Sequence, residues 1–228
     1  MGGKIFQESS CINFNEYQIL ISQLKLQFQF QEPLRLSNKT VYSDIDLILK
    51  INDINSFEIE CKEIDIGSKR FHNTVYSDFK SKHFLFGSVQ IDLLPCINFE
   101  FTRVFYSYEI ANVFFKKLVT CWDKNIKMTS IGLIISSKKL IKEISVDSIL
   151  LKNNNYLITD INFLFENLKL NKKRYFEGFN DCIELLDYFK TSIYFDKIYF
   201  KDNASFRYEC SRLLNLQKLV DLKLINVV

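Results

Sequence analysis

Residues Tyr42–Leu49, which read Tyr-Ser-Asp-Ile-Asp-Leu-Ile-Leu, alternate apolar residues with others in the pattern of a β-strand. One face of that strand carries Val41, Ile45, Leu47 and Leu49, and the other carries Tyr42, Asp44, Asp46 and Ile48. Two carboxylates therefore project from one side, with Cα atoms about 6.5 Å apart at a rise of about 3.3 Å per residue. This spacing suits ligation of a divalent cation or of a cation pair. The plain alternative is an exposed strand face with two solvated aspartates.

A second strand, expected over Phe84–Pro95, carries another aspartate opposite its apolar face. Its apolar face is formed by Val89, Ile91 and Leu93, and its polar face by Ser88, Gln90 and Asp92. If the two strands pair, Asp44, Asp46 and Asp92 converge on one surface. Three carboxylates at one place repel one another, so such a cluster implies a bound cation or a retained proton.

The composition is that of an ordinary globular protein of 228 residues, with 47% hydrophobic and 25% charged residues. The net charge of +3 does not demand a polyanionic partner. Six scattered cysteines without a Cys-x-x-Cys pair, and two histidines, argue against a disulfide framework or a zinc site. The chain has no apolar run long enough to span a membrane, and we expect a cytoplasmic protein without a membrane partner.

The overall pattern predicts an α/β (α+β) fold in two domains, residues 1–125 and residues 126–228. The first domain is expected to begin with an amphipathic helix that Asn13 caps, with Glu16 as its capping-box partner. Pro33 is expected to end this helix.

Further elements of the first domain are expected from local pattern. Residues 57–61 alternate like a strand, and residues 98–106 are aromatic and β-prone. Ser107 is expected to cap a helix that runs to about Thr120.

The second domain is expected to be small and mixed, with strands first and helices after them. The strands are expected at residues 131–135, 143–146 and 156–158, followed by helices that Asn180 and Asn203 cap, to residue 190 and to about residue 222.

The segment Ser43–Leu47, followed by a strand with Ile91-Asp92-Leu93, resembles the nucleotidyltransferase superfamily related to DNA polymerase β. Members of that superfamily carry a helix, a strand with Asp-x-Asp, and a later strand with a third acidic residue. Weaker likenesses to a viral, phage and microbial branch lie in Met1–Gly3, Phe99–Phe101 with Phe105–Tyr108, and Arg174–Phe179 with Ser192–Phe195.

The resemblance implies a nucleotidyltransferase-type mixed sheet with flanking helices, and Mg²⁺ or Mn²⁺ held by Asp44, Asp46 and Asp92. It also implies nucleotide contacts, for which the candidates are Ser37, Lys39, Ser43 and Lys116. The superfamily usually has Gly-Ser shortly before Asp-x-Asp, whereas this chain reads Leu36-Ser37-Asn38-Lys39, with the serine and no glycine.

Three hypotheses about function follow. The first is metal-dependent transfer of a nucleotide from an NTP to a hydroxyl acceptor on RNA, a protein or a small molecule. The second is a degenerate, non-catalytic subunit or adaptor of the same fold in a nucleic-acid-associated complex, with a protein partner. The third is a purely structural interaction protein.

Other candidates have plainer readings. The cluster Lys172–Arg174, beside Tyr175 and Phe176, is typical of a nucleic-acid contact and equally of a solvated helix end. His72 and His83 are expected at the surface.

Overall fold

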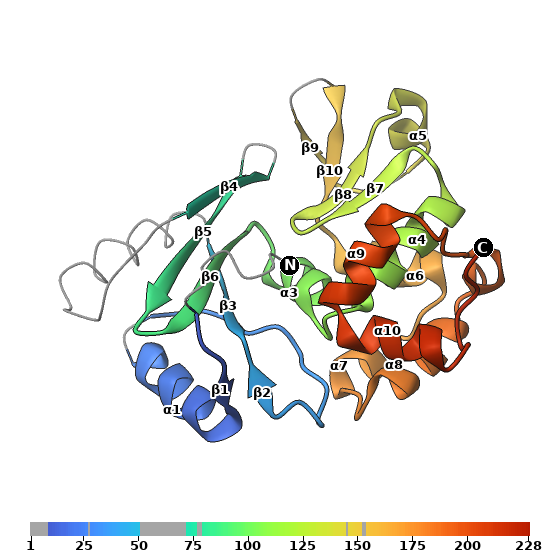
Figure 1. Ribbon diagram of the computed structural model, residues 1–228. Coiled ribbons are helices and arrows are strands. Elements are labelled where there is room, and N and C mark those ends of the chain that lie inside the picture. The colour runs from blue at the N-terminus through green and yellow to red at the C-terminus, as the bar shows by residue number, and fades with distance from the viewer. Residues whose placement is uncertain (1–8, 27, 51–71, 77–78, 145, 152–153) are drawn as a thin grey trace. The chain divides into compact units, whose positions relative to one another are not determined.

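The computed structural model describes residues 9–26, 28–50, 72–76, 79–144, 146–151 and 154–228. The strand expected at residues 57–61 lies outside these ranges. The chain divides into two compact units: residues 1–33 with 39–103, and residues 34–38 with 104–228. The boundary expected after residue 125 falls inside the second unit. The architecture is mixed, with sheets and helices in an α+β arrangement (Figure 1).

Helix α1 of the first unit (Phe14–Lys25) begins at the predicted capping box. The Glu16 amide donates to Asn13 Oδ1 at 3.0 Å, and the Asn13 amide donates to Glu16 Oε2 at 2.8 Å. The helix ends at Lys25 and not at Pro33, so the expected end was wrong. The chain before Pro33 is instead extended, because the amide and carbonyl of Gln31 both hydrogen-bond the backbone of Ile48.

The sheet of the first unit has the strand order β3-β6-β5-β4 (Figure 1). Strand β3 (Asp44–Lys50) runs parallel to β6 (Val89–Cys96), and the other pairings, with β5 (Phe79–Phe86) and β4 (His72–Tyr76), are antiparallel. Two short strands, β1 (Ile12–Asn13) and β2 (Val41–Tyr42), pair separately.

One face of this sheet packs against α1 and forms the core. The alternation predicted this face correctly for its six strand residues, Ile45, Leu47, Leu49, Val89, Ile91 and Leu93, which cluster with Tyr17, Leu20, Ile21 and Leu24 of the helix. The expectation failed before Ser43, where the strand breaks between β2 and β3. Val41 is exposed, and Tyr42 enters the core and stacks on Tyr17 with ring centroids 4.0 Å apart.

The strand expected over Phe84–Pro95 is in fact two strands joined by a tight turn. Gly87 and Ser88 separate β5 from β6, and Phe86 pairs with Val89. Gly87 has φ of 58°, a left-handed conformation that glycine adopts without steric cost. This backbone demand explains the glycine, because an added Cβ would meet no atom within 4 Å.

Residues expected to be β-prone form helix α3 (Phe99–Tyr106) instead. Asn98 supplies the local signal that aromatic composition obscured, since its side chain accepts a hydrogen bond from the Phe101 amide at 3.2 Å. Ser107 does not cap the next helix, α4 (Ala111–Trp122), which has no side-chain cap. Its hydroxyl accepts a hydrogen bond from the Leu34 amide at 2.8 Å.

The second unit contains an antiparallel sheet of order β7-β8-β10-β9, formed by Ile126–Thr129, Gly132–Ile135, Tyr156–Ile158 and Ile149–Leu150. The remaining helices are α5 (Lys138–Glu143), α6 (Ile161–Leu168), α7 (Lys172–Glu177), α8 (Cys182–Lys190), η2 (Phe195–Lys197), α9 (Ala204–Arg212) and α10 (Leu214–Asp221). Strands therefore precede most helices, as expected.

Three local expectations for the second unit were wrong. The strand expected from Glu143 is preceded by helix α5, which Ser137 caps. Asp181 and not Asn180 caps α8, and the helix that Asn203 caps ends at Arg212. None of the described helices is both long enough and apolar enough to cross a bilayer.

Candidate metal centre

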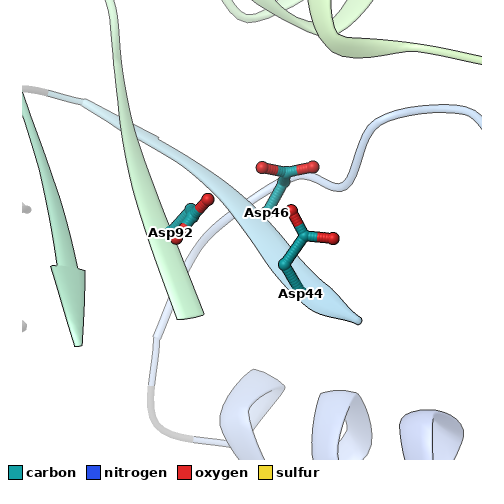
Figure 2. A group of neighbouring side chains, drawn as sticks. All are labelled: Asp44, Asp46 and Asp92. Carbon is teal, nitrogen blue, oxygen red and sulfur yellow. The ribbon is translucent and has the colours of Figure 1, made fainter. Parts of the chain in front are cut away.

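Three aspartates converge on the sheet face opposite α1. Asp44 and Asp46 project from β3, and Asp92 projects from the adjacent strand β6 (Figure 2). The parallel pairing places Asp46 directly beside Asp92 in register. One carboxylate oxygen from each residue lies within 4.8 Å of the others. The convergence predicted from the two alternation patterns is therefore present in the structure.

The cluster is largely withdrawn from solvent. Asp46 is 7% exposed and Asp92 is 1% exposed, and Asp44 is half-buried. Burial removes the water that would otherwise stabilise a carboxylate, and proximity adds repulsion between like charges. This combination differs from the solvated strand face that the sequence left open.

Asp92 is oriented by two buried polar neighbours. His83 Nδ1 and Gln90 Nε2 each lie 2.8 Å from Asp92 Oδ1. With Asp92 ionised, both nitrogens donate to this one oxygen. No hydrogen bond to Asp92 Oδ2 occurs within the described residues, so Oδ2 is the oxygen that Asp92 offers to a cation.

His83 is the site residue that the sequence analysis placed wrongly. It is 4% exposed and not at the surface, because it pairs with Asp92 across β5 and β6. A signal for this position exists in the sequence. A two-residue Gly-Ser turn fixes the hairpin register. Counting back from the pair Phe86–Val89 then brings His83 opposite Asp92.

Two predicted nucleotide-binding residues lie in the first unit near the aspartates in sequence. Ser43 donates a hydrogen bond from its hydroxyl to Asp44 Oδ1 at 3.1 Å, so it joins the cluster as a partner of a carboxylate. The Lys39 ammonium lies 5.3 Å from the ring centroid of Tyr42, a cation–π contact.

The other two predicted nucleotide-binding residues, Ser37 and Lys116, belong to the second unit. The Ser37 amide and hydroxyl both donate to the Phe179 carbonyl, at 3.0 and 3.5 Å. The Asn38 amide likewise donates to the Asn180 carbonyl at 3.2 Å. Lys116 Nζ lies 4.9 Å from the ring centroid of Phe105. The structure thus shows these groups in contacts of their own unit.

The basic cluster Lys172–Arg174 is partly structural. Arg174 forms an ion pair with Glu184, donates to the Gly178 carbonyl, and lies over the ring of Phe179 with 4.4 Å from Cζ to the ring centroid. These contacts explain the arginine by the packing of α7 against α8.

The donor set of the acidic cluster fits a hard divalent cation. Carboxylate oxygens are the ligands that Mg²⁺ and Mn²⁺ prefer, and oxygens bound to one Mg²⁺ lie about 3–4 Å apart, given a metal–oxygen distance of about 2.0–2.1 Å. The three oxygens lie close to that range. His83 supports a ligand in the way that outer partners of metal sites do.

No family model, no curated protein and no solved structure matches this chain. The class of protein is therefore defined by its fold and site alone: an α+β protein with a three-carboxylate candidate metal centre on two parallel strands.

Proposed function

We propose that this chain is a metal-dependent nucleotidyltransferase that moves a nucleotide from an NTP to a hydroxyl acceptor on RNA, a protein or a small molecule. The observation that carries the proposal is the convergence of Asp44, Asp46 and Asp92 on adjacent strands, after a capped helix. The resemblance of these segments to the polymerase β-related superfamily supplies the reaction class.

In this proposal Asp44, Asp46 and Asp92 hold Mg²⁺ or Mn²⁺. The bound ions would lower the pKa of an attacking hydroxyl and neutralise charge on the leaving pyrophosphate. Ser43 orients Asp44, and His83 and Gln90 orient Asp92, so that the carboxylates are positioned before the cation arrives. The buried floor of the cluster limits access of water and strengthens each electrostatic contact.

A second candidate function is favoured by the contacts of Ser37. In the resembling superfamily the Gly-Ser segment binds the nucleotide phosphates with its backbone and serine. Here the glycine is absent, and the Ser37 amide and hydroxyl are committed to the Phe179 carbonyl. A non-catalytic subunit that binds metal or nucleic acid without transferring a nucleotide would need no free amide at this place.

The two candidates are separated by measuring metal binding and transfer on the same protein. Mn²⁺ binding is followed by titration calorimetry or electron paramagnetic resonance, and transfer by incubation with each α-labelled NTP, Mg²⁺ or Mn²⁺ and total RNA. We expect both signals in the natural protein and neither in Asp92→Asn. The matched control is Asp147→Asn, which removes an exposed carboxylate of the second unit.

Metal binding without transfer of any nucleotide would support the non-catalytic subunit. Absence of Mn²⁺ binding at millimolar concentration would contradict the metal centre itself.

A further inference from the structure

A pocket of about 500 Å³ in the second unit is lined by four lysines that reach it from three segments. Lys116 and Lys117 come from α4, Lys197 from η2, and Lys201 from the segment before α9. One carboxylate, Glu209, shares the lining. The volume lies in the range of small-molecule sites, about 300–1,000 Å³.

The lysines are held in place without carboxylate partners among the described residues. Lys117 Nζ donates to the Tyr199 carbonyl at 2.8 Å and lies 4.6 Å from the ring centroid of Phe200. No ion pair joins any of the four lysines to a carboxylate in the described part of the chain. Positive charge is therefore concentrated in a concave place and left largely uncompensated.

The electrostatics of the pocket favour an incoming anion. Burial lowers the pKa of Lys116, Glu209 raises it, and Arg212 and Lys127 lower it further. Burial also lowers the pKa of Lys117; Cys121 opposes this shift and Lys201 adds to it. An anion among these ammonium groups would relieve their repulsion. Lys116 and Lys201 remain exposed, so an anion can reach them.

The rest of the lining suits a ligand with both a phosphate and a ring. The first turn of α9 brings the Ser205 hydroxyl to the pocket, and a helix N-terminus adds partial positive charge. Tyr199 is 49% exposed and Phe206 is half-buried, so both present aromatic surface beside the lysines. Aromatic faces next to a cationic groove are the pairing that holds a base and its phosphate.

We propose that this pocket binds a nucleoside phosphate, with Lys116 and Lys201 contacting the phosphate and Tyr199 stacking on the base. The site uses residues of the second unit alone. It requires no divalent cation, and it therefore does not depend on the proposed transferase activity.

The test is calorimetric titration with AMP, ribose 5-phosphate and inorganic phosphate in EDTA at low salt. The double variant Lys116→Gln/Lys201→Gln should raise the Kd for AMP at least about tenfold, since charge-assisted contacts are lost. The matched control Lys138→Gln/Lys139→Gln removes the same charge from exposed positions of α5 and should leave the Kd unchanged. Lys117 is kept, because it supports Tyr199 and Phe200.

Tyr199→Ala separates base from phosphate. It should weaken AMP at least about fivefold and leave inorganic phosphate unaffected, because a base–aromatic stack is lost. AMP should also protect Lys116 from an amine-acylating reagent. Asp46→Asn should bind AMP like the natural protein, which keeps this test apart from the metal centre.

Equal loss of affinity in the pocket and control lysine variants would overturn the site. Equal affinity for AMP and inorganic phosphate would overturn the assignment of Tyr199 to the base.

Discussion

Neighbouring residues of β3 perform opposite tasks, and the difference is decided by which side of the strand each occupies. Ile45 is fully buried against α1, and Asp46 lies on the other face beside Asp92. Substitutions at these two positions should therefore separate stability from metal chemistry.

Asp46→Asn should abolish metal binding and spare the fold. Removing one of three close negative charges lowers their repulsion, so the melting temperature without metal should stay unchanged or rise. Transfer activity should fall roughly 10²–10³-fold, as when one well-placed electrostatic contact is lost. Thermal melts in EDTA and Mn²⁺ titration measure the two effects. Ile45→Ala is the control and should destabilise the fold by about 2–5 kcal/mol. An Asp46→Asn protein with unchanged Mn²⁺ affinity would refute the site.

His83 should act on the metal through Asp92. His83→Leu removes the donor to Asp92 Oδ1 and should weaken Mn²⁺ binding about 10–100-fold, the usual effect of an outer partner of a metal ligand. His83→Asn places an amide N–H near the position of Nδ1 and should restore much of the affinity. If both variants lost the same affinity, the histidine would serve packing and not orientation.

At the scale of elements, the hairpin β5–β6 sets the geometry of the site. The turn at Gly87 and Ser88 fixes which residue of β5 faces Asp92, and a shift of one residue would turn every side chain to the other face. The parallel pairing of β6 with β3 then fixes the second relation, Asp46 beside Asp92.

Gly87→Ala should destabilise the first unit by about 1–2 kcal/mol, the cost of a left-handed conformation for a residue with Cβ. Nothing lies within 4 Å of that Cβ, so the cost is conformational and not steric contact with other residues. Urea unfolding measures it. Gly87→Asn should cost less, because asparagine tolerates this conformation better. Equal stability of the alanine variant and the natural protein would show that the turn can adopt another shape.

At the scale of the whole molecule, the chain forms two units with different cores. The first is an aliphatic layer between a sheet and α1. The second is strongly aromatic: Phe115 makes edge-to-face contacts with Phe165, Tyr175 and Phe189. The high phenylalanine content of the sequence is used largely here.

Phe115→Ala should destabilise the second unit by about 3–5 kcal/mol, because a fully buried ring leaves a cavity. Hydrogen exchange of the α4 and α6 amides should accelerate, while the amides of β3 and β6 and the Mn²⁺ affinity should change little. Leu47→Ala is the mirror control in the first unit. Equal acceleration in both units by either variant would show that the two unfold as one cooperative body.

The candidate site was predictable to the extent that it depends on local alternation. Period-two patterns in two segments placed Asp44, Asp46 and Asp92 opposite their apolar faces, and a capping box placed the start of α1. Alternation works here because one face of each strand must be buried, and a half-buried strand records that requirement in its own residues.

Tertiary structure decided what depends on partners far apart in the chain. Whether β3 runs beside β6, and in which register, is set by long-range pairing that neither strand records alone. Tyr42 turns into the core because a ring of α1 stacks on it, and His83 is buried because the hairpin brings it opposite Asp92. A strand pattern shows which side of a residue faces inward, and only the folded chain determines what it meets there.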